Sequence, residues 1–206
     1  MGGDKKMGQN TLYTIGYRAF DIAAFLSALK EHHVDILIDV RSKPFCRHHP
    51  CYNKPALEES MKAAGIDYQN YIREFGGRQE DIRFYDDNGM MDYEVFAASE
   101  QFMSGVVKVR HDMSCGKTIA FMCAEEDPLE CHRALLVARA FDELGCTVIH
   151  LLPEHQTKTQ RELEEELLNR IPESMRSSVS GDTDKRRLAY RLQNQAIWRS
   201  KKGSKE

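Results

Sequence analysis

The stretch CAEEDPLECHR, residues 123–133, places two cysteines, a histidine and an arginine at one junction between secondary-structure elements. The residues just before it, 118–122, form an apolar run of the length typical of a buried strand. After it, apolar residues recur at helical spacing: Ala134, Val137, Ala138 and Phe141. The stretch therefore predicts a strand that passes into a helix, which is the repeating unit of an α/β fold.

The start of that helix can be predicted from its capping residues. Asp127, Pro128 and Glu130 fit an N-cap, a first-turn proline and the third helical residue. Cys131 and His132 would then lie in or just past the first turn, where free N–H groups and the helix dipole favour a thiolate or a bound anion. We expect a ligand-binding or catalytic site here.

Strand and helix patterns alternate outward from this junction. Expected strands are 12–15, 34–40, 65–68, 118–123 and 147–152, and expected helices are 22–29, 55–64, 93–110, 128–144 and 158–168. Residues 72–91 have no clear period and are expected to form a long surface excursion. The pattern predicts an α/β fold with a mainly parallel sheet, helices on both faces and a single compact domain.

The two ends of the chain differ from this domain. We expect residues 1–10 to be a disordered N-terminus, 11–170 to be the α/β domain and 171–206 to be a basic helical C-terminal extension. From residue 185 onward there are eight Lys or Arg and one Glu, a net charge of about +7 in a chain whose net charge is -3. A solvated terminal helix is the favoured interpretation, and contact with nucleic acid or an acidic partner is the alternative.

Composition narrows the class of protein. The chain has 206 residues, 41% of them hydrophobic, which is enough for one core. The longest apolar runs fall short of the roughly 20 residues of a membrane span, so we expect no membrane partner and a cytoplasmic location. The six cysteines are expected to be reduced.

The expected strands end in polar residues. Gly16 and Tyr17 follow one strand, Asp39 and Arg41 end a second, and Cys123 ends a third. Because ligands bind at the carboxyl ends of parallel strands, these residues should meet at one edge. A buried aspartate needs a partner, which would be Arg41 or Arg133. We expect Asp39, Arg41, Cys123, Glu125 and Arg133 to converge on one crevice, with two guanidiniums flanking an anion.

Spaced motifs along the chain are similar to those of a known family. They are Thr14-Ile15-Gly16-Tyr17, Asp39-Val40-Arg41 with Pro44 and Arg47, Phe75-Gly76-Gly77-Arg78, and Cys123-Ala124-Glu125 with Cys131-His132-Arg133. Together they resemble the domain of unknown function 488 family from Thr11 to about Leu152, with further likeness around Tyr190 to Asn194. The resemblance implies a compact α/β domain and marks candidate positions but names no reaction. Arg18 and Cys46 depart from the family, which often has serine there.

The marked positions divide into two groups. Candidate catalytic residues are Cys123, Glu125, Cys131 and His132. Candidate ligand-binding residues are Tyr17, Asp39, Arg41, Arg47, Gly76, Gly77, Arg78 and Arg133.

Three chemistries remain open for them. A cysteine thiolate could attack an anionic substrate, with Glu125 moving a proton. A metal could be held by Cys123, Cys131 and His132, with help from the loop 46–51. This is less favoured because adjacent residues diverge on a helix and no paired short-spacing motif is present. Lastly, the cysteines could be core residues beside an anion-binding arginine cluster.

We therefore predict an enzyme that acts on a phosphate-bearing or nucleotide-like ligand at the strand carboxyl ends, with a cysteine thiolate as one route. The alternative is a non-catalytic nucleic-acid-binding module. The expected partner is an anionic small molecule or nucleic acid, and no cofactor is predicted.

Overall fold

The computed structural model describes residues 10–176 and 179–203. The predicted N-terminal disorder, except at Asn10, lies outside the described residues. One six-stranded sheet has the order β3-β2-β4-β1-β5-β6. Its strands are β1 (Thr11–Gly16), β2 (Ile36–Asp39), β3 (Asp67–Asn70), β4 (Ile119–Cys123), β5 (Thr147–Leu151) and β6 (Thr157–Thr159). Strands β1 to β5 pair in parallel, and only β6 is antiparallel.

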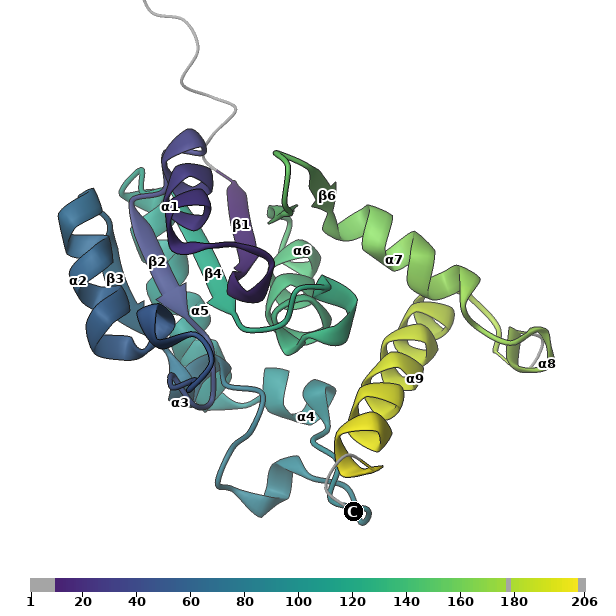
Figure 1. Cartoon of the computed structure of the whole chain (residues 1–206). Coiled ribbons are helices and arrows are strands. Elements are labelled where there is room, and N and C mark those ends of the chain that lie inside the picture. Colours follow the sequence, from purple (N-terminus) through teal and green to yellow (C-terminus); the bar gives the residue numbers. More distant parts are fainter. Residues whose placement is uncertain (1–9, 177–178, 204–206) are drawn as a thin grey trace, which may run out of the picture.

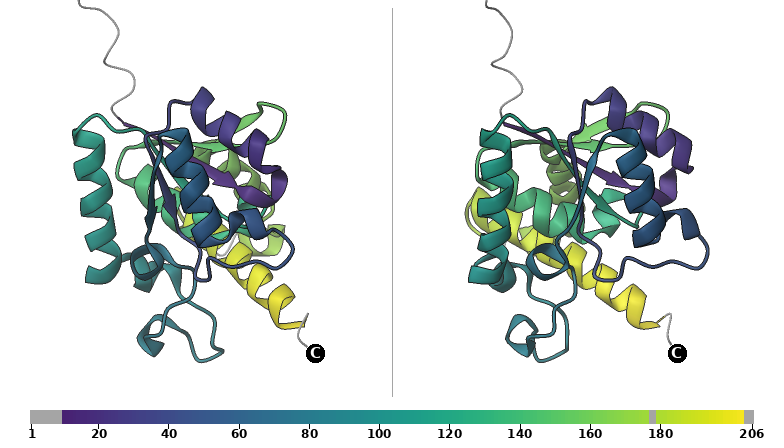
Figure 2. Two further views of the ribbon diagram at one scale, coloured as in Figure 1. Left: turned by 60° about the vertical axis from the view of Figure 1, so that its left-hand side comes forward. Right: turned by 90° about the vertical axis from the view of Figure 1, so that its left-hand side faces the viewer.

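Helices cover both faces of the sheet (Figure 2). The α-helices are α1 (Ile22–Glu31), α2 (Lys54–Ala64), α3 (Ile72–Phe75), α4 (Tyr93–Ala97), α5 (Glu100–Ser114), α6 (Arg139–Glu143), α7 (Gln160–Asn169), α8 (Glu173–Arg176) and α9 (Asp182–Gly203). Short turns of 3-10 helix are η1 (Tyr17–Ala19), η2 (Pro50–Tyr52), η3 (Ile82–Phe84) and η4 (Pro128–Glu130), and a π-helical segment, η5, spans Arg133–Ala138. The predicted single-domain α/β fold is confirmed.

Strand β4 shows why two layers of helices are needed. Its five residues are all buried, as expected of a central parallel strand. Phe121 and Cys123 pack with α5 and α6, whereas Ala120 and Met122 pack with α1 and α2 on the opposite face. Because side chains alternate along a strand, the last one, Cys123, faces the α5 and α6 side. The junction after β4 therefore emerges on that side.

The junction itself differs from the sequence-based prediction. Asp127 does cap a turn, since its carboxylate accepts from the Leu129 N–H at 2.8 Å. That turn, η4, ends at once, and Cys131 is extended with φ -136° and ψ 137°. The main helix begins at Arg133. The predicted continuous helix from residue 128 is thus wrong. Asp127 caps a single 3-10 turn, and the extended Cys131 separates that turn from the main helix.

A second predicted helix is also divided. The segment 93–110 forms the separate helices α4 and α5, since Ser99 accepts from the Phe102 N–H and caps α5. The segment 72–91 contains only the short α3 and η3. The prediction that it is a surface excursion is wrong in part, because Phe75, Phe84 and Met91 are buried in the main core.

The C-terminal helix lies against the domain. In Figure 1, α9 starts below the far end of α7 and runs at an angle to it, down toward the segment that carries α4. Ala189, Tyr190 and Ile197 are buried together with Leu163 and Leu167 of α7. The prediction of a helix is confirmed, but a separate basic tail is not, because one side of this helix completes a hydrophobic cluster. No helix in the described part of the chain is long and apolar enough to cross a membrane.

A buried chain of hydrogen bonds joins the sheet to α7 and α9. Thr14 Oγ1 lies 2.7 Å from His150 Nδ1, and His150 Nε2 lies 2.8 Å from Gln160 Oε1. The Gln160 amide in turn donates to Tyr190 Oη at 2.9 Å. Since an amide oxygen only accepts, His150 Nε2 carries the proton and Nδ1 accepts from Thr14. Burial, followed by the charge of Arg133, lowers the pKa of His150 to about 3.

This buried histidine predicts a loss of stability in acid. The unfolded chain takes up a proton below the ordinary pKa of 6.5, whereas the folded chain does not until about 3. The stabilisation is therefore complete above pH 6.5 and is lost as pH falls toward 3. Comparison of wild type with His150→Gln by urea unfolding should show the wild-type advantage shrinking by about 1 to 2 kcal/mol between pH 7 and pH 5. An advantage that stays constant over this range would contradict a neutral His150.

Candidate functional site

A pocket of about 880 Å³ opens at the carboxyl ends of the strands. The parallel register places Gly16 opposite Cys123, and Asp39 opposite Met122, so β1, β2 and β4 end together. The predicted residues that line this pocket are Tyr17, Arg41, Gly77, Arg78, Cys123, Glu125 and His132. Lining residues that the sequence did not single out for it include Lys43, Phe45, Arg73 and Lys201.

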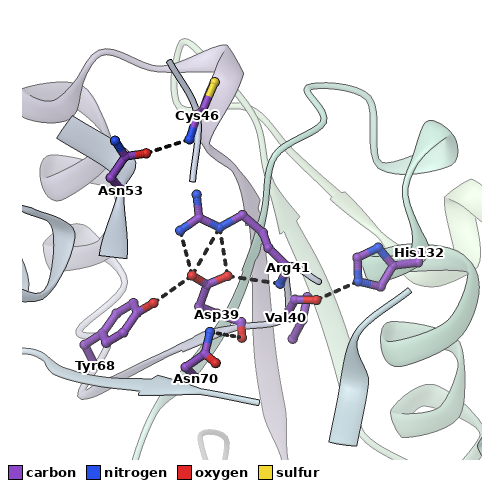
Figure 3. A network of polar contacts seen from close by, with 8 residues as sticks. All are labelled: Asp39, Val40, Arg41, Cys46, Asn53, Tyr68, Asn70 and His132. Carbon is purple, nitrogen blue, oxygen red and sulfur yellow. Dashed lines mark hydrogen bonds and ion pairs between the residues drawn. The ribbon is translucent and has the colours of Figure 1, made fainter. Parts of the chain in front are cut away.

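A buried ion pair holds Arg41 at the pocket wall. Asp39 is fully buried and Arg41 is 4% exposed. Arg41 Nε donates to Asp39 Oδ1 at 2.9 Å and Nη2 donates to Oδ2 at 2.7 Å (Figure 3). The Arg41 N–H also donates to Oδ1, and Tyr68 Oη donates to Oδ2 at 2.7 Å. The expected pairing of Asp39 with an arginine is thus observed with Arg41, and Asp39 acts by orienting it.

One nitrogen of this guanidinium takes no part in the ion pair. Arg41 Nη1 is buried and has no hydrogen-bond partner among the described residues. It points away from Asp39 in Figure 3. A buried donor without a partner costs about 1 to 3 kcal/mol. The Tyr17 ring lies over the same guanidinium, with 5.2 Å between the ring centroid and the central carbon of Arg41.

Arg133 has a different place from the one predicted. It is fully buried, and its Nη1 and Nη2 donate to the backbone oxygens of Glu125 and Glu126 at 2.6 and 3.0 Å. It does not line the pocket. The expectation of two guanidiniums flanking an anion is corrected: Arg133 fixes the loop after β4, because those two carbonyls have no strand partner to bind.

The loop fixed by Arg133 presses against the end of β1. A Cβ atom on Gly16 would lie 1.9 Å from the Glu125 backbone oxygen and 2.8 Å from Arg133 Nη2. Glycine is therefore required where β1 leads into the Tyr17 turn. This close approach explains one residue of the family-like motif by packing rather than by ligand contact.

The four candidate catalytic residues form one cluster. Cys123 Sγ and Cys131 Sγ lie 3.2 and 3.1 Å from Glu125 Oε2. His132 Nδ1 lies 3.8 Å from Cys123 Sγ. Of these residues, Cys131 alone is absent from the pocket lining, because it is fully buried behind Cys123.

The side chains of the cluster shift one another's pKa values in different directions. Burial alone would raise the pKa of Glu125, but His132, Lys201 and the two thiols lower it to about 2. Lys201 Nζ, from α9, lies 3.3 Å from Glu125 Oε1. Burial and the Cys131 and Glu125 charges raise the pKa of Cys123. The pKa of Cys131 is lowered despite its burial, through the Cys123 hydrogen bond, Arg133 and His132. The thiol with the lowered pKa is thus Cys131, whereas the thiol that borders the pocket is the buried Cys123.

The two glycines of the Gly76-Gly77-Arg78 motif act mainly through close packing. A Cβ on Gly77 would lie 2.7 Å from the His132 ring, and one on Gly76 would lie 2.4 Å from the Ile72 backbone oxygen. Gly77 therefore lets the loop touch the imidazole. Arg78 is exposed at the pocket rim, where its backbone N–H donates to Ser42 Oγ at 2.9 Å.

The loop 46–51 contributes fewer residues to the site than its cysteines, histidines and arginine suggested. Arg47 is exposed and does not line the pocket, so its predicted ligand contact is not seen. Cys46 does line it, and Asn53 Oδ1 accepts from its backbone N–H at 2.6 Å. Within residues 10–176 and 179–203, the group of three metal-ligating side chains that comes together is Cys123, Cys131 and His132, without any from this loop.

A matched pair of variants tests how much the buried ion pair contributes to the free energy of unfolding. Asp81 and Arg83 repeat the Asp39–Arg41 geometry at the surface, with Nε to Oδ1 at 3.0 Å and Nη2 to Oδ2 at 2.6 Å. Asp39→Asn should lower the free energy of unfolding by about 3 to 5 kcal/mol, because it leaves the Arg41 charge buried without a counter-charge. Asp81→Asn should have a much smaller effect, because water solvates its pair. Equal losses in urea unfolding would show that burial does not matter here.

Comparison with known proteins identifies the family only. The family model described as a domain of unknown function, DUF488, matches residues 21–140 of the 206-residue chain. No curated protein and no solved structure matches the chain. The matched range holds the Asp39–Arg41 pair, both motif glycines and the thiol cluster, while the Gly16-Tyr17 motif precedes it. Since the match covers more than half of the sequence, the chain belongs to the DUF488 family of domains of unknown function.

Proposed function

We propose that this chain is an enzyme that binds a phosphate-bearing or nucleotide-like anion in the strand-end pocket and acts on it at the thiol cluster. The observation that carries the proposal is the buried Arg41 Nη1, which has no hydrogen-bond partner among the described residues and belongs to a residue that lines the pocket. A phosphate oxygen is a strong acceptor for such a nitrogen, because both carry charge.

The rest of the pocket supports an anionic ligand. The pocket's exposed lining cations are Arg18, Lys43, Arg73 and Arg78. They outnumber the carboxylates of the lining, which are Glu80, Asp81 and Glu125. Phe45 at the same rim is 54% exposed, an unusual state for a phenylalanine. A ring in that position can stack on a nucleotide base while the cations meet the phosphate.

The presence of Glu125 favours an enzyme over a binding module. A carboxylate beside Cys123 and His132 repels an anion, so a site built only for anion binding gains nothing from it. Its geometry allows proton transfer, because it lies within hydrogen-bond reach of two thiols and borders the pocket. We therefore assign the reaction to the Cys123, Glu125 and His132 side of the pocket, and ligand binding to the arginine side.

Nucleic-acid binding through α9 is less well supported. Arg186 pairs with Glu164 at 2.8 Å, and Lys201 pairs with Glu125 at 3.3 Å. These ion pairs neutralise part of the basic charge within the domain, which weakens the continuous basic surface that such a function needs.

Binding of adenosine monophosphate tests the ligand assignment. Arg18→Ala combined with Arg78→Ala should weaken binding at least about tenfold, because two charge-assisted contacts are lost. Isothermal titration at low salt gives the affinities, and Arg161→Ala on α7 is the control because this exposed cation is remote from the pocket lining. Arg41→Ala is unsuitable because it would leave Asp39 buried without its partner. Wild-type affinity in the double variant, or an equal loss in the control, would refute a phosphate site here.

Turnover separates an enzyme from a binding module. Wild-type protein mixed with nucleotides and phosphate monoesters should convert at least one of them, detected by ³¹P nuclear magnetic resonance. Glu125→Gln should bind that compound as tightly as wild type or more tightly, since the repelling charge is gone, and should convert it at least about 100-fold more slowly. Unchanged turnover in Glu125→Gln would contradict the role given to this carboxylate.

A further inference from the structure

Three soft or nitrogen ligand atoms converge at the floor of the pocket. Cys123 Sγ, Cys131 Sγ and a ring nitrogen of His132 all lie within 4.8 Å of one another. They come from two segments, the end of β4 and the residues just before η5. The separation of 3.8 Å between Cys123 Sγ and His132 Nδ1 is close to the spacing of two ligands on one tetrahedral ion.

The orientation of His132 supports a metal ligand. Its Nε2 lies 2.8 Å from the backbone oxygen of Val40, which can only accept (Figure 3). The proton of the neutral ring therefore sits on Nε2, and the lone pair of Nδ1 faces the sulfurs. Metal-ligating histidines almost always donate their other ring N–H in this way, because the bond fixes the ring. Gly77 packs tightly against the Cγ and Nδ1 edge of the same ring.

The local backbone removes the objection raised by the sequence. On a helix, the adjacent side chains of Cys131 and His132 would point in different directions. Cys131 is instead extended and His132 is the residue that caps η5. The break between η4 and η5 thus lets two neighbouring residues direct their ligand atoms to one point.

We propose that Cys123 Sγ, Cys131 Sγ and His132 Nδ1 bind a Zn²⁺ ion. A site with two thiolates and one imidazole binds Zn²⁺ in preference to harder cations such as Mg²⁺. Two thiolates beside the Glu125 carboxylate would repel one another, and a divalent cation between the sulfurs offsets that repulsion. Three protein ligands leave a fourth position open, as in catalytic zinc sites.

An open fourth position would border the pocket, because two of the three ligands, Cys123 and His132, line it. Water or an oxygen of the anionic ligand can occupy it. The ion would also offset the negative charge that Glu125 presents to such a ligand. This inference concerns the same pocket as the proposed function but does not depend on it, since metal content is measured without any ligand.

Metal analysis of the full-length, reduced protein tests the site. After zinc loading and removal of free metal, wild type should retain about one zinc per chain, and Cys131→Ser should bind it at least about 100-fold more weakly. Cys115→Ser is the matched control, because Cys115 is an exposed thiol 3.9 Å from His111 Nε2 and lies outside the cluster. Equal zinc content in wild type and Cys131→Ser would overturn the assignment.

Cobalt spectroscopy of the wild type tests the same ligands without the Cys131→Ser variant, so the proposal can be tested even if that variant does not fold. Co²⁺ in this site should give thiolate-to-metal charge-transfer bands and the intense visible bands of tetrahedral coordination, and both should persist in Cys115→Ser. Absence of thiolate charge transfer in the wild type would overturn the proposal, as would its loss in the Cys115 variant. Neither result depends on adenosine monophosphate, so failure of the zinc site and failure of the phosphate site are separate outcomes.

Discussion

The buried ion pair between Asp39 and Arg41 is the constraint around which the pocket is built. An aspartate at the end of a central strand is costly to bury, and Arg41 meets that cost with Nε and Nη2 while Tyr68 supplies a further donor. Because two of its nitrogens are fixed, the guanidinium cannot turn to satisfy the third. The same contact that stabilises the strand end therefore leaves Nη1 without a partner among the described residues.

A second buried arginine fixes the opposite wall. Arg133 binds the Glu125 and Glu126 carbonyls, which holds the loop after β4 against Gly16. Glu125 is thereby placed beside both thiols, and Lys201 from α9 reaches its other oxygen. The two arginines are similarly buried but have different partners: Arg41 binds a carboxylate and lines the pocket, whereas Arg133 binds backbone oxygens and does not line it.

The sequence predicted the sheet and its polar edge because strand alternation and burial are local properties. The need of Asp39 for an arginine also followed from its apolar neighbours. The orientation of Arg133 could not be predicted from the sequence. Its partners are backbone oxygens of a loop, and the path of that loop does not follow from residue types. Likewise the single turn after Asp127 decided where Cys131 and His132 point, and the contact of Lys201 with Glu125 depends on how α9 packs.

A crystal structure of the protein with adenosine monophosphate would show whether Arg41 Nη1 binds the ligand. A phosphate oxygen is expected within about 3 Å of Arg41 Nη1 while the two hydrogen bonds to Asp39 stay in place. The nucleotide should lie on the face bordered by Cys123 and Glu125. A well-ordered nucleotide bound elsewhere, or an Arg41 Nη1 bonded to a group of the protein itself, would show that Arg41 does not bind the phosphate.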